Sequence, residues 1–214
     1  MQHDINDGLT MLRRTSVNLD ITHRCPLECP RCQRFTSFTS KGLKVPGEDM
    51  SLKDFNKVVN HFQHINFCGQ VSDPVHHPKF IEFLKLLHEN NSSVSVHHAT
   101  AAKPRSWYPK AFKANPNARW WFGIDGLPNE SHKYRINQDG EKLFDIMVEA
   151  KQYLRHLPVW QYIVFKYNEN HIDEAHEMAK EAGVQFMVVN SSRWLGDNDE
   201  YKPSKEHSLS LHNG

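Results

Sequence analysis

The stretch Cys25-Pro-Leu-Glu-Cys29-Pro-Arg-Cys32 holds three of the four cysteines of this 214-residue chain. Thiols spaced four and then three residues apart can face one point from a single loop, and thiolates are ligands for soft metals. A cubic iron–sulfur cluster has four irons, so three thiolates would leave one iron open to a ligand that is not protein. The stretch therefore predicts a metal centre with an open position, held by Cys25, Cys29 and Cys32.

The segment before this loop, Thr15-Ser-Val-Asn-Leu-Asp-Ile-Thr22, alternates between polar and apolar residues. Such alternation predicts a short strand, which here feeds the cysteine loop from its C-terminal end. Barrel and α/β proteins place their sites at that end of the strands. We therefore expect the chemistry of the chain at this edge of a sheet.

Val17-Asn-Leu-Asp-Ile-Thr-His-Arg-Cys25, with the two cysteines that follow, resembles the signature of the radical S-adenosylmethionine (radical SAM) superfamily. The resemblance implies a [4Fe–4S] cluster whose open iron binds the amino and carboxylate groups of SAM. An electron from the cluster, supplied by a donor such as flavodoxin or ferredoxin, would cleave SAM to methionine and a 5′-deoxyadenosyl radical. The residue before the third cysteine is usually aromatic and near the adenine in this superfamily, and Arg31 stands here. Its guanidinium plane could stack in the same place, or be a solvated charge.

Alternatives to the cluster stay open on these residues. A structural zinc knot, with His23 as a fourth ligand, would make the chain a non-catalytic binding module, and the thiols could also be unconnected. Zinc sites usually come as paired C-x2-C units, and the sequence has no second unit of that kind. A further alternative keeps the cluster but makes the chain an activase, which places a radical on a glycyl-radical partner protein.

Composition limits the class of protein. Lys and Arg total 26 against 25 Asp and Glu, without a long run of one sign, so no nucleic-acid partner is expected. The apolar runs are far shorter than the ~20 residues that span a bilayer, and the start lacks the apolar core of a signal peptide. Four cysteines grouped as three plus one do not resemble a disulfide framework, which favours a reducing compartment. We expect a soluble, cytoplasmic protein without a membrane partner.

Hydrophobic periodicity predicts alternating strands and helices. Strands are expected at 15–22, 64–68, 93–97, 119–125, 159–167 and 184–189, and helices at 51–62, 80–87, 107–114, 143–150 and 172–182. Such alternation indicates an α/β fold with a parallel sheet, and six units resemble the partial (β/α)6 TIM-like barrel of radical SAM enzymes. We expect one domain over 1–214, with an arm at 1–14, the barrel at 15–193, an irregular excursion at 34–48 and a polar tail at 194–214. No cysteine follows Cys68, so the resemblance is to a small form without a C-terminal auxiliary-cluster (SPASM) domain.

The end of the second expected strand carries candidate site residues. Cys68-Gly-Gln-Val-Ser-Asp-Pro74 resembles a variant of the superfamily's Gly-Gly-Glu-Pro motif, which receives the amino group of SAM. Gly69 would let the backbone approach the ligand, and Gln70 or Asp73 would accept the amino group. An ordinary strand-to-helix turn also favours these residue types. Cys68 is a candidate hydrogen-atom donor to a substrate radical, or simply a buried thiol.

Other strand ends supply the remaining candidates. Asp125 ends a hydrophobic strand beside a glycine, where a carboxylate could accept the hydroxyls of a ribose or cap a turn. By resemblance, Arg135 would lie near the SAM carboxylate. We expect further contacts to SAM or substrate from these residues: His98, Thr100, Gln161, Lys166 and Asn190. The small open barrel predicts a wide mouth for a peptide or a sizeable metabolite.

Overall fold

The computed structural model describes residues 14–205, 207 and 210–212, and these residues form one sheet of seven strands in the order β1-β2-β3-β4-β5-β6-β7. The strands are β1 (Arg14–Asn18), β2 (Phe62–Phe67), β3 (Ser93–His98), β4 (Arg119–Gly123), β5 (Val159–Val164), β6 (Gln185–Asn190) and β7 (Ser210–His212). β1 to β6 pair in parallel, which confirms the predicted α/β fold with six parallel strands. β7 pairs antiparallel with β6. β7 was not among the expected strands, and it lies in the expected polar tail.

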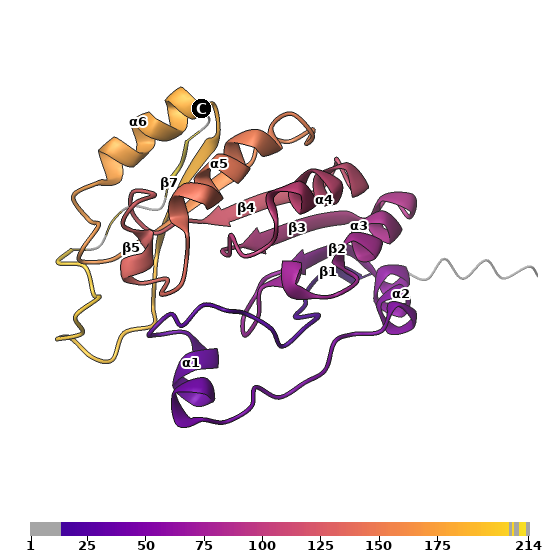
Figure 1. Cartoon of the computed structure of the whole chain (residues 1–214), viewed down its shortest axis with the longest axis horizontal. Helices are drawn as coiled ribbons and strands as arrows, with labels where there is room; N and C mark the ends of the chain where they lie inside the picture. The colour runs from indigo at the N-terminus through magenta and orange to yellow at the C-terminus, as the bar shows by residue number, and fades with distance from the viewer. Residues whose placement is uncertain (1–13, 206, 208–209, 213–214) are drawn as a thin grey trace, which may run out of the picture.

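Six α-helices connect the strands, together with short 3-10 turns. They are α1 (Gln33–Ser37), α2 (Leu52–His61), α3 (Phe80–Glu89), α4 (Tyr108–Ala114), α5 (Gly140–Ala150) and α6 (Ile172–Ala182). Figure 1 shows α2 to α6 along one side of the sheet, with α1 apart from them on the segment that passes below the strands. The predicted arm at 1–14 lies outside the described residues, except for Arg14, which begins β1.

Local sequence explains where several helices begin and end. The Ser51 hydroxyl oxygen accepts a hydrogen bond from the Asp54 amide at 3.1 Å, as an N-cap does. The Asp139 carboxylate accepts from the Lys142 amide at 3.0 Å and caps α5 in the same way. At the other end, Gly183 takes the left-handed conformation that closes α6, with φ of +64°. These signals account for the good agreement of the predicted helices with the structure.

The excursion predicted as irregular at 34–48 is partly helical, because α1 begins within the cysteine loop and a 3-10 turn (Thr39–Lys41) follows it. The strands β1, β4 and β5 end earlier than predicted. After β4 and β5 the backbone turns to bond side chains instead of the neighbouring strand. The Asp125 amide donates to the Ser131 hydroxyl at 2.8 Å, and the Phe165 amide donates to the Asn168 side-chain carbonyl at 2.7 Å.

The two faces of the sheet differ in chemistry. The face covered by α2 to α6 holds the main apolar core, in which Phe55 stacks on Phe83 with ring centroids 4.2 Å apart. The other face carries polar side chains from neighbouring strands, and Asn66 donates to the Asn18 side chain at 2.8 Å. Asn18 is exposed and Asn66 is half-buried, so this face is more polar and more open than the face that holds the main core.

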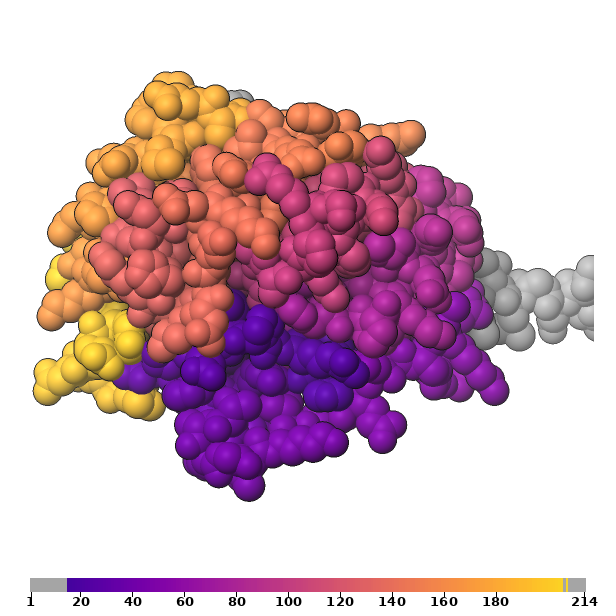
Figure 2. All heavy atoms as spheres, viewed as in Figure 1, coloured from indigo at the N-terminus to yellow at the C-terminus, as the bar shows by residue number. Residues whose placement is uncertain are grey.

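The expected tail is held against the cysteine loop. The Arg31 guanidinium bonds the Asp199 carboxylate through Nε at 2.8 Å and Nη2 at 3.3 Å, and it lies over the Tyr201 ring at 5.0 Å. On the turn after β5, the Glu169 carboxylate accepts from the Ser204 amide and hydroxyl at 2.7 and 2.9 Å. Figure 2 shows the same juxtaposition, with the yellow C-terminal segment beside the indigo N-terminal residues. Among the described residues, no helix has the length and apolarity needed to cross a membrane.

Candidate active site

A cavity of about 310 Å³ lies at the carboxyl ends of the parallel strands, and all four cysteines contribute to its wall. The predicted site residues that line it are Cys25, Cys29, Cys32, Cys68, Gly69, Asp73, His98, Arg135, Gln161 and Asn190. Other predicted site residues are not part of the lining: Gln70, Thr100, Asp125 and Lys166. Residues from the ends of several strands therefore line one cavity, at the edge of the sheet where the sequence predicted a site.

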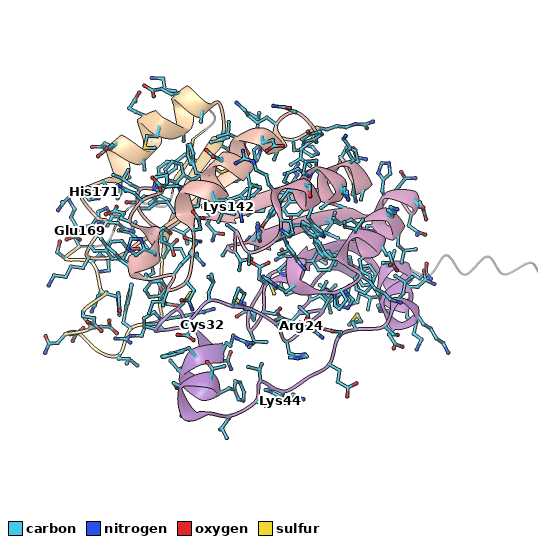
Figure 3. All side chains as sticks on the ribbon, in the orientation of Figure 1. Arg24, Cys32, Lys44, Lys142, Glu169 and His171 are labelled. Atoms are coloured by element: carbon cyan, nitrogen blue, oxygen red, sulfur yellow. The ribbon has the colours of Figure 1, made fainter. Side chains whose placement is uncertain are left out.

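The cysteine loop is shaped by its own backbone and by α1. The Cys32 amide donates to the Cys29 carbonyl at 3.0 Å, and Cys32 is the residue from which α1 begins. From α1, Arg34 returns to the loop, where its Nη1 donates to the carbonyl of His23 and, at 3.3 Å, to that of Val71. Figure 3 shows Cys32 above α1, beneath the strands. The short helix thus fixes the loop that carries the thiols.

The thiols lie in an apolar setting. Cys29 is buried, while Cys25 and Cys32 are half-buried, and all three are free cysteines. They pack with Leu27 and a group of aromatic rings in a second, smaller core. Burial raises the pKa of Cys29 to about 12 and raises that of Cys25 as well, although the Arg135 charge counteracts the shift at Cys29. Metal binding at these thiols would release protons.

The donor set suits a cluster. No three His, Cys, Asp or Glu side chains in the described part of the chain are grouped to hold a single metal ion. A cubic cluster requires a different arrangement of ligands. Each thiolate binds a different iron, so the three sulfurs must surround the volume of the cluster. Three free thiols around one cavity, with no acidic side chain besides Asp73 in its lining, match that demand. Cys25, Cys29 and Cys32 therefore fit the cluster that the resemblance implies.

Gly69 stands where the chain leaves β2 and turns into the cavity wall. Its φ is +62°, and a Cβ at this position would lie 2.7 Å from the Ser72 carbonyl oxygen. The turn therefore requires glycine both for its conformation and for space. The Ser72 hydroxyl donates to the Asp20 carboxylate at 2.6 Å, which ties this turn to the segment after β1.

Asp73, predicted as a possible acceptor for SAM, is already bonded within the protein. Its carboxylate accepts from the amides of Val75, Ala99 and Thr100 at 3.2, 2.8 and 3.2 Å, and from the His98 Nδ1 at 3.1 Å. Burial alone would raise its pKa, but His98 and these hydrogen bonds hold the pKa below its usual value. Asp73 thus fastens the turn after β2 to the end of β3.

His98 and Thr100 also contribute to the contact between the turn after β2 and the end of β3. The His98 side chain is fully buried and bonds Asp73, and it packs near Trp120 and Phe122 on the core side. The Thr100 hydroxyl lies 2.9 Å from Nε2 of His76, away from the cavity lining. Their predicted contact with SAM stays a prediction, and the geometry gives both residues a supporting place.

Asp125 and Arg135 form a buried ion pair behind the cavity wall. Nε of Arg135 lies 2.7 Å from Oδ2 of Asp125, and the Ile163 amide donates to Oδ1 at 3.1 Å. Burial raises the pKa of Asp125, and Arg135 opposes that shift. Asp125 does not line the cavity, whereas Arg135 does, so the arginine carries the charge that a ligand would meet. A ribose contact by Asp125 stays a prediction.

His97 is a cavity residue that the sequence analysis did not single out. It stacks on Trp121 with ring centroids 5.4 Å apart and an interplanar angle of 10°, and its Nδ1 lies 3.3 Å from Oε1 of Gln161. An amide oxygen only accepts, so Nδ1 carries the proton and Nε2 is left as an acceptor. Burial lowers the pKa of His97, which keeps the ring neutral. Its place at the C-terminal end of the strand expected at 93–97 was the available signal.

Aromatic rings of the cavity come from residues other than position 31. Arg31 is not part of the lining, because its guanidinium is engaged by Asp199 and Tyr201. Tyr134 and Phe165 line the cavity instead, and they stack with centroids 4.0 Å apart. The expectation that Arg31 could take the place of the usual aromatic residue thus loses its support, and a wall of two rings stands close to Cys29.

The far rim is formed by the residues that follow β6. Asn190, Ser191, Ser192 and Arg193 all line the cavity. Nδ2 of Asn190 donates to the His207 carbonyl, which ties the strand end to the chain after it. Nη2 of Arg193 donates to Oε1 of Gln70 at 3.3 Å, and both residues are exposed. Gln70, predicted to face SAM, therefore sits at the rim, and Lys166 is exposed outside the lining.

The sequence matches no protein-family model and no curated protein, but several solved structures share its fold. Streptococcus suis SuiB superposes with a TM-score of 0.67 and 11% identity, over 91% of this chain and 43% of that chain. Native anSMEcpe with bound AdoMet and Cp18Cys peptide gives 0.62 and 14%, over 88% and 54%. Methylornithine synthase (PylB) gives 0.58 and 10%, over 83% and 53%. The chain thus spans about half the length of the structures it matches.

These matches concern the fold, because the identities are low. The matched proteins are radical SAM enzymes, and the partial TIM-like barrel expected from the sequence is the fold that the chain shares with them. SuiB is also known bound to S-adenosylmethionine and bound to the precursor peptide SuiA. The resemblance seen in the sequence is therefore confirmed at the level of architecture.

Proposed function

We propose that the chain is a radical SAM enzyme, which binds a [4Fe–4S] cluster through Cys25, Cys29 and Cys32 and takes a hydrogen atom from a peptide or a small metabolite. The observation that carries this proposal is the meeting of the three thiols with Gly69 and Arg135 around one cavity at the carboxyl edge of the sheet. The fold shared with radical SAM enzymes and the three-cysteine motif both support this class.

The cluster, when bound, supplies the electron that splits the sulfonium of SAM and so generates the 5′-deoxyadenosyl radical. The protein's own part is to hold and orient. Gly69 keeps a side chain out of the turn after β2, so that its backbone can meet the amino group of a ligand. Arg135, fixed by Asp125, presents a positive charge suited to a carboxylate. Asp73 and His98 are positioning residues, because their contact holds the turn after β2 against the end of β3.

The rest of the cavity would exclude water and receive the substrate. Tyr134 and Phe165 offer flat apolar surface beside Cys29 and are suited to an adenine ring. Cys68 lines the cavity as a free thiol whose pKa is raised by burial, so a hydrogen atom is present on its sulfur at neutral pH. That supports its proposed role as a hydrogen-atom donor to a substrate radical.

A peptide is the substrate class that the comparisons favour, since SuiB and anSMEcpe are known with bound peptides. A small metabolite is the other proposed class, because a cavity of about 310 Å³ is within the size range of small-molecule sites. An electron donor such as flavodoxin or ferredoxin would complete the system in the cell, and we propose that the cell compartment is the cytoplasm.

Anaerobic reconstitution of the full chain with iron and sulfide tests the proposal. We expect about four irons per chain, since three thiolates on one loop hold a cubic cluster. SAM under dithionite should then give 5′-deoxyadenosine. A protein that takes up stoichiometric zinc and no iron would instead be the zinc-stabilised binding module. A protein that cleaves SAM only when a large glycyl-radical partner co-purifies with it would be the activase.

A further inference from the structure

Arg193 forms a contact that links two distant strand ends over the cavity. It lies three residues after β6, and its Nη2 donates to Oε1 of Gln70, which lies three residues after β2. In the sheet, β3, β4 and β5 stand between these two strands. Arg193 lines the cavity and both residues are exposed, so the contact spans the mouth above the ends of the three middle strands.

The charges around the cavity leave Arg193 without an acidic partner. The charged residues of the lining, cysteines and histidines aside, are Asp73 and three arginines. The Asp73 carboxylate is occupied by backbone amides and His98, and Arg135 is paired with Asp125. Arg34 donates to carbonyls of the cysteine loop region. Among the described residues, Arg193 therefore differs from the other two lining arginines. Its side chain bonds one neutral side chain, that of Gln70.

The hydrogen bond between Arg193 and Gln70 is weak enough for an anionic ligand to replace it. It is a single hydrogen bond of 3.3 Å to an amide oxygen at an exposed site. A guanidinium has five N–H donors in a planar fork, and it bonds a carboxylate or phosphate through two of them at once. The bond to Gln70 is charged on the donor side alone, whereas a carboxylate or phosphate adds an opposite charge and accepts two hydrogen bonds at once. An oxyanion arriving at the mouth would thus displace the amide.

The residues beside Arg193 suit the same ligand. Ser191 and Ser192 line the cavity next to it, and hydroxyl groups donate readily to oxyanions. The Ser191 hydroxyl oxygen accepts from the Arg193 amide at 3.1 Å, which leaves its own proton to donate and fixes the turn after β6. The rim after β6 thus gathers one cation and two hydroxyl groups at the entrance.

We propose that Arg193 binds an oxyanion of the substrate, a carboxylate or a phosphate, and exchanges the Gln70 amide for it as the substrate enters. This inference rests on the proposed function, because it assigns a substrate class to the same cavity. It makes the substrate an anion whose charged group stays at the mouth, while the carbon that loses its hydrogen lies deeper, toward the cysteine loop.

The test is a titration of the full chain, with and without reconstituted cluster, by sodium acetate and by inorganic phosphate at constant ionic strength. The signals are the backbone amide resonances of Ser191 and Ser192, which are present in every variant, and in chains that keep Arg193 also its Nε–Hε resonance. We expect saturable binding, weakened about tenfold or more in Arg193→Gln and by a smaller factor in Arg193→Lys, which keeps the charge but loses the planar fork. Gln70→Ala should tighten binding a few-fold, because the competing amide is gone. The tighter of the two probes identifies carboxylate or phosphate.

Two results would overturn the inference. Equal binding by the wild type and Arg193→Gln would show that the anion binds elsewhere. Loss of anion binding when SAM is added would show that Arg193 holds the carboxylate of SAM itself. The proposed function fails separately, by absence of iron uptake or of SAM cleavage, and the anion titration of the cluster-free chain is independent of both.

Discussion

The side chain of Arg135 fills the space that any side chain at Gly123 would need: a Cβ on Gly123 would lie 2.7 Å from Nη2 and 3.0 Å from Cζ of the guanidinium. Gly123 ends β4, so the strand itself makes room for the arginine that lines the cavity. The guanidinium is 14% exposed and pairs with Asp125. Burial alone would lower the pKa of Arg135, but the Asp125 carboxylate raises it. Gly123 itself also lines the cavity, so the glycine shapes the wall and leaves room for Arg135.

Gly123→Ala should destabilise the chain by about 1 to 3 kcal/mol, since the added methyl group must push a paired guanidinium aside. SAM binding should weaken as well, because Arg135 moves. A double-mutant cycle in urea unfolding checks the cause: in an Arg135→Ala background the alanine at position 123 should cost less than about 0.5 kcal/mol. An equal cost in both backgrounds would place the strain elsewhere.

The variant Asp73→Asn distinguishes a structural role of Asp73 from a role in binding SAM. The substitution puts an NH2 group against backbone amides that need an acceptor, so we expect a loss of about 2 to 3 kcal/mol in urea unfolding. Asp139→Asn is the matched control, because asparagine caps a helix as well as aspartate does and should change little. Unchanged stability of Asp73→Asn together with weakened SAM binding would return Asp73 to the ligand contacts.

The four cysteines should divide into three and one. Cys25→Ala, Cys29→Ala and Cys32→Ala should each lose the intact cluster, because a cubic cluster with only two thiolates is poorly held. Cys68→Ala should keep about the wild-type iron content and 5′-deoxyadenosine formation, and lose a later step if the thiol donates a hydrogen atom. Iron and sulfide analysis with electron paramagnetic resonance provides the readout. Iron loss in Cys68→Ala would make it a ligand.

The Arg31–Asp199 pair gives a prediction about pH. The hydrogen bond from Arg31 lowers the pKa of Asp199 to about 2, against an ordinary value of 3.8. A lowered carboxyl pKa stabilises the fold fully above the ordinary value, and that stabilisation is lost as the pH falls toward about 2. At pH 4 residues 194–205 should therefore stay protected in hydrogen exchange. Asp199→Asn should expose them at pH 7 and pH 4 alike.

His97 should remain a neutral ring with its proton on Nδ1. Burial lowers its pKa from 6.5, so we expect titration below that value, and the neutral state holds above it. Nitrogen-15 shifts of a histidine-labelled sample report both the pKa and the protonated nitrogen. Gln161→Glu should raise the pKa, because an opposite charge favours the protonated ring. A ring that is charged at pH 7, or protonated on Nε2 alone, would contradict the assigned geometry.

Much of the architecture follows from local sequence. Alternating apolar residues predicted the six parallel strands, and caps such as Ser51 and Gly183 placed the helix ends. The three thiols and Arg135 were found because short motifs place them at strand ends, and strand ends of a parallel sheet converge. Their presence in one cavity lining agrees with that reasoning.

The features that were not predicted depend on contacts between residues far apart in the sequence, which no local pattern reveals. The sequence does not show that the Asp73 carboxylate is used by the backbone after β3, or that Arg31 meets Asp199 across 168 residues. β7 is three residues long and lies in a polar stretch, so periodicity could not detect it. Strand lengths were overestimated where side chains of Ser131 and Asn168 take over the backbone amides.

The separation of Arg31 from Asp199 bears on the timing of assembly during synthesis. A chain emerges from its N-terminus, so the loop with the three thiols is made long before the residues that will fasten it. For most of translation the loop therefore lacks its ion pair with Asp199, although the contact between the Glu28 amide and the Ile136 carbonyl can form earlier. Once Asp199 arrives, its carboxylate pairs with Arg31 and fixes the C-terminal segment to the cysteine loop, so the last residues to be made complete a contact with some of the first.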